Sequence, residues 1–391
     1  MLTEQFSRRD FLKGSGALVV TFTLGAPLAH AATRGEASPV KTVAADEVAG
    51  FLAIDSRGRA TVYSGKVDLG TGVYTALTQI AAEELYLPLE KVELIQGDTA
   101  LTPDQGTTWG SLSIQIGGMQ IRQACATARE ALVDMAAQKL GVARTALYVK
   151  DGEVRRLGSE QGIAYGALVA KQQFTMKVDA KAPTKNPALY TVVGTPVRRL
   201  DIPDKVMARF EYMQDFRRKG MVHARVVRPA GIKSQLVSFD DTASKKIPGY
   251  LATVRKGSFL AVVARNEWAA IRSADAMKAQ WSDWQGLPER SQLWQHVRAT
   301  KVNKEEVLQN VGNVAEGLKG GAKTLSATYD FAVHTHGSIG PSCAVAETSQ
   351  GKLTVWTASQ ATHGLRKQLA KMLSLKPEEV RCIYVEGAGC Y

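Results

Sequence analysis

The stretch Val67-Asp-Leu-Gly-Thr-Gly-Val-Tyr-Thr75 joins two patterns that together decide the fold. Before it, residues 51–55 and 57–64 form short, largely apolar runs around a turn, which is typical of two strands. After it, apolar side chains recur at helical spacing, at Leu77, Ile80, Ala81 and Leu85, and Pro88 ends the predicted helix. With a further strand at 92–96, the sequence predicts a mixed α/β unit.

The glycine turn is also a candidate anion site, formed by Gly70, Thr71 and Gly72. Backbone amides at a helix start could hold a phosphate or another anion. Thr75 stands where a dinucleotide-binding fingerprint has its third glycine, so a nicotinamide nucleotide is not favoured and a plain tight turn remains the alternative. Ser111 and Ser113 flank a second turn before a helix expected over 117–139, where their hydroxyls could bind a pyrophosphate or cap the helix.

The N-terminal residues have the order of a twin-arginine export signal. Ser7-Arg-Arg-Asp-Phe-Leu-Lys13 is followed by a mildly apolar run at 16–28 and by Ala29-His-Ala31. The apolar run is shorter than the roughly 18 to 20 residues that a membrane span needs. We expect a mature chain from about Ala32, located in the periplasm, after a linker at 32–46. This export route suggests a cofactor, because it carries proteins that are already folded.

Composition narrows the class of function. The chain has 391 residues, 45% of them hydrophobic, which is enough for two or three domains with a core. Its net charge is +12. The basic residues are scattered without aromatic interleaving, so we expect no nucleic-acid partner and interpret the charge as a solvated surface, with one face suited to an acidic subunit. Cys125, Cys343, Cys382 and Cys390 form no C-x-x-C pair, so any iron-sulfur cluster belongs to another chain.

The rest of the chain consists of two further regions after a proline-containing linker at 182–187. The first has strands expected at 222–227, 235–239, 251–254 and 259–264, then a helix over 267–281. The second has strands near 324–333 and at 352–357, a helix over 363–373 and a strand at 380–385.

Two side-chain pairs are weaker candidates. His334 and His336 would share one face of a strand, but without a third ligand nearby we favour packing or pocket lining over a metal site. Glu83 and Glu84 are adjacent in the first helix, where neighbours point about 100° apart. We therefore expect at least one of them to be exposed, and no acid–base pair.

Taken in order, three stretches resemble the molybdenum hydroxylases, the xanthine dehydrogenase and aldehyde oxidase family. Residues 67–113 resemble its glycine turn, helix and serine segment, and residues 193–281 resemble its hammerhead domain. Residues 334–346, Trp356-Thr-Ala-Ser-Gln360 and Gly387-Ala-Gly-Cys-Tyr391 resemble the entry into its main cofactor domain. The glycine turn precedes the hammerhead, as in the permuted large (beta) subunits of the isoquinoline 1-oxidoreductase type.

The resemblance implies an α/β (α+β mixed) fold in five parts. These are a twin-arginine signal peptide at 1–31, the linker at 32–46, a permuted molybdopterin-binding segment at 47–189, a hammerhead-like α/β domain at 190–284, and the incomplete beginning of the main molybdopterin-binding domain at 285–391.

The resemblance also implies a cofactor, molybdopterin cytosine dinucleotide, held by Gly70, Thr71, Gly72, Ser111, Ser113, Gln360, Gly389 and Cys390. Amides at turns suit a pyrophosphate, and a glutamine offers a donor and an acceptor to a pterin. The implied activity is oxidation of an N-heterocycle or an aldehyde with water as the oxygen source. Electrons would pass to a small iron-sulfur subunit, with a cytochrome c as a further acceptor to consider.

The sequence departs from the family in two places. Thr71 stands where many relatives have glutamine, and the family's Gly-x-Gly-Glu segment with its catalytic glutamate is absent, so we assign no catalytic residue. We expect the isolated chain to be truncated and inactive, with the C-terminal half either supplied by a second polypeptide or lost. The alternatives are a non-catalytic scaffold or partner-binding remnant, and an unrelated exported binding protein.

Overall fold

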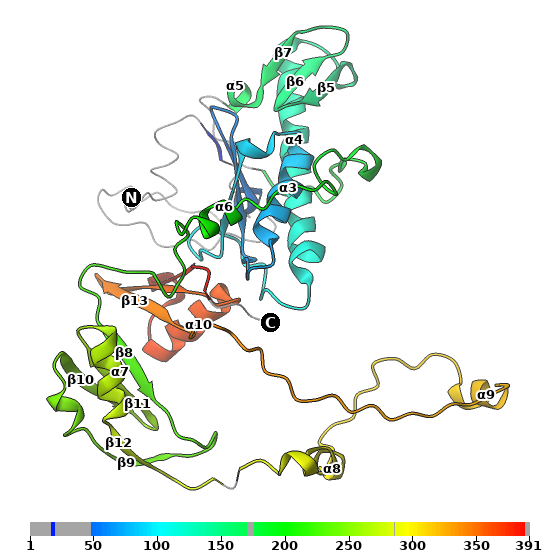
Figure 1. The fold of residues 1–391 in the computed structure, drawn as a ribbon. Coiled ribbons are helices and arrows are strands. Elements are labelled where there is room, and N and C mark those ends of the chain that lie inside the picture. Colours follow the sequence, from blue (N-terminus) through cyan, green and yellow to red (C-terminus); the bar gives the residue numbers. More distant parts are fainter. Residues whose placement is uncertain (1–16, 20–47, 170–175, 285, 388–391) are drawn as a thin grey trace. The chain divides into compact units, whose positions relative to one another are not determined.

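The computed structural model describes residues 17–19, 48–169, 176–284 and 286–387, which form two compact units (Figure 1). Unit 1 combines the chain up to Phe216 with the chain from His336 onward, and unit 2 is Arg217–Thr335. The predicted signal and linker lie outside the described residues, apart from the short strand β1 (Ala17–Val19). Unit 2 contains most of the predicted hammerhead-like domain, whose boundaries stay a prediction.

The first sheet of unit 1 follows the predicted strand, glycine turn and helix. Its strand order is β1-β2-β3-β4, with β2 at Leu52–Asp55, β3 at Ala60–Ser64 and β4 at Val92–Gln96. β3 and β4 are parallel, and helix α3 (Val73–Leu85) connects them. This part confirms the predicted mixed α/β class.

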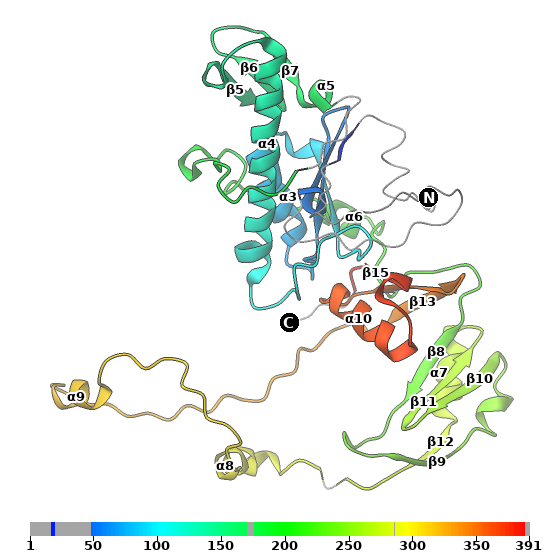
Figure 2. The ribbon, with the colours of Figure 1, turned by 180° about the vertical axis from the view of Figure 1, so that it is seen from behind.

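A long helix, α4 (Met119–Leu140), lies beside α3 (Figures 1 and 2). It continues from a π-helix, Ser113–Gly118, in the segment where the sequence predicted the helix start. Apolar side chains removed from water are the main stabilising contribution here. The core of the sheet and the two helices includes Ile54, Val62, Leu77, Ala81, Ile121, Ala124 and Leu132, all fully buried.

An antiparallel meander follows α4. It consists of β5 (Leu147–Lys150), β6 (Glu153–Arg156) and β7 (Gly162–Ala164). Short helices also occur in unit 1, namely α2 (Val48–Phe51), α5 (Tyr165–Val169), α6 (Ile202–Val206) and 3-10 turns at Leu89–Lys91, Arg144–Ala146, Pro187–Leu189 and Pro377–Glu379.

The C-terminal part of unit 1 repeats the parallel strand–helix–strand arrangement. β13 (Ala344–Ser349) is antiparallel to β14 (Lys352–Thr357), β14 is parallel to β15 (Val380–Tyr384), and helix α10 (Thr362–Leu373) connects these two. β15 binds the loop after β4: the amide of Thr99 donates to the Cys382 carbonyl (2.9 Å), and the Cys382 amide donates to Thr99 Oγ1 (2.9 Å). Segments far apart in sequence therefore form one body.

Unit 2 contains two small sheets. One has the order β10-β11-β8, from β10 (Tyr250–Lys256), β11 (Phe259–Ala264) and β8 (His223–Val227). The other pairs β12 (Lys278–Trp281) with β9 (Leu236–Asp240). The remaining helices are α7 (Glu267–Asp275), α8 (Leu293–Ala299), α9 (Val314–Lys319) and 3-10 turns at Ser244–Lys246 and Arg290–Gln292.

Two predicted elements of unit 2 are wrong. The helix expected over 267–281 ends at Asp275, because residues 278–281 pair with β9 and pack Trp281 against the core of this unit. The segment 324–333, where a strand was expected, has no ladder partner among the described residues, and its side chains are exposed.

Within the described ranges, none of the helices combines the length and the apolar character that crossing a membrane requires.

The expectation for Glu83 and Glu84 is also wrong, because both side chains are buried, with 2% and 1% exposure. Lys185 forms an ion pair with Glu83, whose carboxylate also accepts the backbone amides of Val192 (2.6 Å) and Val193 (2.7 Å). Burial alone would raise the pKa of Glu83, but these donors lower it. The glutamate is therefore charged and anchors the segment 179–193 to α3.

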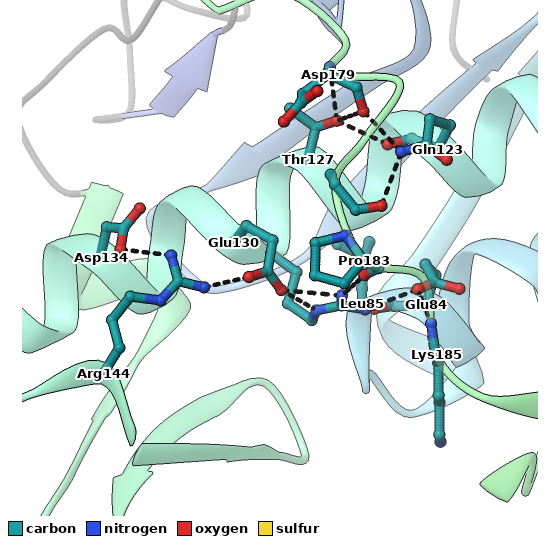
Figure 3. A network of polar contacts seen from close by, with 12 residues as sticks. Glu84, Leu85, Gln123, Thr127, Glu130, Asp134, Arg144, Asp179, Pro183 and Lys185 are labelled. Atoms are coloured by element: carbon teal, nitrogen blue, oxygen red, sulfur yellow. Dashed lines mark hydrogen bonds and ion pairs between the residues drawn. The ribbon is translucent and has the colours of Figure 1, made fainter. Parts of the chain in front are cut away.

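Glu84 belongs to a second group of charges, which links α3, α4 and the segment 179–193 (Figure 3). Arg129 donates to Glu84 Oε1 (2.7 Å), and the backbone amide of Lys185 donates to the same oxygen (2.6 Å). Glu130 also binds Arg129 (2.9 Å), and on its other side it pairs with Arg144. A buried charge is tolerated only when it is paired and hydrogen-bonded, and this network meets that condition.

Candidate functional site

A concavity of unit 1, lined by uncharged polar and apolar residues, surrounds Gln360, just before α10. It has a volume of about 620 Å³. Its described lining has no Asp, Glu, Lys or Arg side chain and consists of Thr107, Met213, Gln214, His336, Ser338, Ser342, Cys343, Thr357, Ala358, Ser359, Gln360 and Ala361. Amide, hydroxyl and imidazole groups around a neutral cavity suit a flat heterocycle with its own donors and acceptors.

Gln360 is fixed by a reciprocal pair of hydrogen bonds with Thr108. The Gln360 side-chain Nε2 donates to the Thr108 carbonyl (2.7 Å), and the Thr108 amide donates to the Gln360 carbonyl (3.0 Å). A carbonyl can only accept, so the amide nitrogen must face Thr108. The side-chain oxygen of Gln360 is thus the atom available to a ligand in this arrangement.

The glycine turn has the backbone that the sequence predicts. Gly70 and Gly72 have φ values of 89° and 84°, which glycine adopts without strain. However, the Asp68 carboxylate accepts the amides of Gly70 (2.8 Å), Gly72 (3.2 Å) and Tyr74 (2.9 Å). The protein's own carboxylate therefore occupies amides that were expected to bind a phosphate, and Thr71 is exposed beside them.

Further carboxylates lie next to this turn. A cavity of about 440 Å³ is lined by Asp68, Asp201, Asp204, Glu211 and Glu386 together with apolar and aromatic side chains. Lys205 lies between Asp201 and Glu386, at 2.7 Å from each. Burial raises the pKa of Glu386, and Lys205 only partly offsets this effect. A pyrophosphate is not favoured in so acidic a cavity.

The serine segment lies on the surface. Ser111 has a φ of 60° and is exposed, whereas Ser113 is buried at the start of the π-helix. Neither serine caps this helix or α4 through its side chain, so the capping alternative is wrong. Trp109, Ile114 and Ile116 around them are exposed apolar residues.

Thr108 brings the predicted segments together. Its hydroxyl accepts the amide of Val67 (3.0 Å) at the start of the glycine-turn stretch, its backbone binds Gln360, and the serine segment follows it directly. Gly389 and Cys390 lie outside the described residues, but Gly387 lies against Ala358, since a Cβ there would be 2.8 Å from it. The geometry is consistent with one site, and the assignment of individual residues to a cofactor stays a prediction.

Sequence reasoning did not select Lys66, Asp68, Thr108 or His363. His363 is 4% exposed, and burial lowers its pKa to about 4, so it is neutral. No local signal marks these residues, because their partners come from distant segments.

Of the predicted histidines, His336 lines the Gln360 cavity and His334 is exposed, and neither lies in a strand. In the part of the chain described, no three His, Cys, Asp or Glu side chains are placed to hold a metal.

The mixed α/β fold holds a cavity suited to a heterocyclic ligand, and comparison with known proteins shows the family. Two family models described as molybdopterin cofactor-binding domain match residues 3–202 and 296–389. The chain belongs to the molybdopterin-binding large subunits of the molybdenum hydroxylases. The contact between Thr108 and Gln360 therefore joins the two matched regions.

Several known proteins are similar to this chain. The B subunit of nicotinate dehydrogenase from Pseudomonas putida is 34% identical over 98% of this chain and 33% of its own length. The beta subunit of isoquinoline 1-oxidoreductase from Brevundimonas diminuta is 27% identical over 71% of this chain and 40% of its own length. Among solved structures, quinoline 2-oxidoreductase from Pseudomonas putida 86 aligns with half of this chain and 30% of its own, at 16% identity and a TM-score of 0.40. The chain thus spans less than half the length of these relatives.

Proposed function

We propose that this chain supplies the pterin-holding part of a molybdenum hydroxylase that oxidises an N-heterocycle or an aldehyde. The observation that carries the proposal is the neutral cavity around Gln360, built where the two matched regions meet. Its donors and acceptors fit a pterin, while the acidic cavity beside Gly70 does not fit a pyrophosphate. In its bound state the cofactor would supply the redox-active metal that takes two electrons from the substrate.

The residues of this chain would then bind and orient the cofactor. Gln360 presents its side-chain oxygen, and Ser359 its hydroxyl, toward the cavity wall that Thr107 completes. The Thr108 backbone keeps Gln360 in one orientation, which reduces the entropy lost on binding. Trp109 and Ser111 are the exposed residues of the serine segment, with Ser113 buried beneath them, and we propose that this segment contacts the nucleotide portion, in the cytosine form.

The assay is the molybdenum content of chain produced in cells that make the cofactor, measured by mass spectrometry, with the released nucleotide identified chromatographically. We expect near-stoichiometric metal in the native chain and a loss of most of it in Gln360→Leu. Gln295→Leu, on the exposed side of α8, is the matched control and should retain the metal. A native chain that folds but contains neither molybdenum nor pterin would overturn the proposal.

We further propose that the chain is exported to the periplasm and transfers electrons to a small iron-sulfur subunit. Support for export comes from Arg8 and Arg9 ahead of the apolar run and the small residues at its end. Replacing both arginines by lysine should retain the protein in the cytoplasm, as cell fractionation would show. Equal periplasmic amounts of both forms would contradict export by this route. Co-purification of an iron-sulfur protein with the tagged chain tests the partner.

A further inference from the structure

A buried lysine lies directly behind the Gln360 cavity. Lys66 follows β3 and is only 2% exposed. Its ammonium Nζ donates to the carbonyl of Thr107 at 2.7 Å. Its side-chain stem is closely packed, since a Cβ on Gly117 would be 2.8 Å from Lys66 Cγ. A buried ammonium whose partner is a neutral carbonyl is uncommon, because burial without an opposite charge is unfavourable.

The positive charge of Lys66 has no direct counter-ion in the described part of the chain. The carboxylate of Asp104 raises the pKa of Lys66, against the larger lowering effect of burial. Asp104 itself pairs with a different lysine, Lys367, at 3.1 Å. The ammonium is therefore directed at a backbone carbonyl and not at an ion pair.

That carbonyl belongs to a chain of polarised peptide groups. The Thr107 carbonyl and the Thr108 amide are two ends of the same peptide unit, and the Thr108 amide donates to the Gln360 carbonyl (3.0 Å). The next peptide unit continues the series, because the Ala361 amide donates to Ser359 Oγ (3.2 Å). A charge at one end of such a chain strengthens each following hydrogen bond.

The loop that carries Thr107 has other anchors, so Lys66 is not needed simply to hold it in place. Gln105 Oε1 accepts the Ser64 hydroxyl (2.9 Å) and the Gly65 amide (2.9 Å). Gln105 Nε2 donates to Gln120 of α4 (2.8 Å). What Lys66 adds to these neutral contacts is a full charge.

We propose that Lys66 is a positioning residue that acts through the Thr107–Thr108 peptide to fix the backbone of Gln360 and the hydroxyl of Ser359 at the cavity wall. The inference rests on the proposed function for its consequence, namely tighter retention of the cofactor. The polarised chain itself exists without any ligand. The two statements can therefore be tested separately.

Hydrogen exchange of the full chain without cofactor, followed by mass spectrometry, tests the relay. Lys66→Met keeps the length of the stem and removes the charge. We expect exchange to be about tenfold faster in peptides that contain the amides of Thr108 and Ala361, with α3 and α4 unchanged. Lys367→Met, which removes the lysine paired with Asp104, is the matched control and should leave both peptides unchanged.

Lys66→Gln removes the charge and leaves a neutral donor, whose nitrogen lies one bond closer to the backbone than Lys66 Nζ. It serves as the main variant if Lys66→Met does not fold. We expect an intermediate acceleration in the same two peptides. Wild-type exchange in Lys66→Gln, or uniform acceleration throughout unit 1, would overturn the proposal.

Molybdenum retention in Lys66→Gln then tests the consequence. We expect a lower metal content than in the native chain, and no further loss when Lys66→Gln is added to Gln360→Leu, because both act at one position. Independent, additive losses would contradict the relay. A native chain without metal would overturn the proposed function and leave the exchange result standing.

Discussion

Replacing Arg129 by methionine tests whether the buried charges between α3 and α4 stabilise unit 1. Arg129 Nη1 donates to Glu84 Oε1 (2.7 Å) and to the Glu84 carbonyl (3.0 Å), and its Nε donates to Glu130 (3.1 Å). Methionine retains the apolar stem and removes every donor. The carboxylate of Glu84, 1% exposed, is then left with fewer positive partners.

The expected loss of stability in Arg129→Met depends on which hydrogen-bond and ion-pair partners Glu84 retains. Removing one partner of a buried ion pair costs about 3 to 5 kcal/mol. Arg122 still lies 3.2 Å from Glu84, and the Lys185 amide still donates to it, so the lower end of the range applies. We therefore expect a loss of about 3 kcal/mol, equivalent to roughly a hundredfold or more in the opening equilibrium of α4.

Native-state hydrogen exchange of α4 peptides in increasing urea measures that opening equilibrium. Arg144→Met is the matched control, because Arg144 binds Glu130 from a half-exposed position and should contribute less than about 1 kcal/mol. Adding Glu84→Leu to Arg129→Met should recover part of the loss, since an apolar pair can replace a buried ion pair. A loss below about 1 kcal/mol for Arg129→Met would refute the reasoning.

Three further predictions concern single positions. Gly65→Ala would place a Cβ 2.2 Å from a backbone carbonyl oxygen and should lower the urea midpoint, whereas Gly317→Ala, with open space around it, should leave it unchanged or raise it slightly. Because the folded pKa of His363 is lowered to about 4, its contribution is complete above about pH 6.5 and is lost toward pH 4, by at most about 3 kcal/mol. Urea midpoints at pH 7 and 4.5 should therefore differ less in His363→Gln than in the native chain, and an equal difference would contradict this. Iodoacetamide should label exposed Cys343 in the native protein and not Cys125, whose thiol pKa is raised by burial; mass spectrometry of the labelled peptides decides.

The sequence predicts elements best where one periodicity covers a whole element. α3 contains the predicted apolar positions and ends before Pro88, β4 has its predicted bounds, and β15 ends one residue earlier than predicted. The helix predicted over 267–281 fails because its last four residues gain more by pairing with β9, which lies about 40 residues earlier in the chain. Local patterns do not contain that information.

The candidate site shows the same limit. Sequence reasoning selects Gln360 and the serine segment, but not the Thr108 backbone that joins them across about 250 residues. It also expects an exposed glutamate at 83 or 84, since the partners that permit burial, Arg129 and Lys185, follow much later. Residues defined by distant partners become visible only in the folded chain.

The discontinuity of unit 1 affects when the protein can mature. Its first part ends at Phe216, yet the loop after β4 finds its partners Cys382 and Ile383 only after all of unit 2 has been synthesised. During translation, unit 2 can fold before the C-terminal part of unit 1 has been synthesised. Until then, the backbone groups of the first part of unit 1 that pair with β15 have no partner. The Gln360 cavity forms only when α10 and β15 dock. Any ligand of this cavity must therefore enter after these segments leave the ribosome, and chaperones that protect the waiting part would have a defined period in which to act.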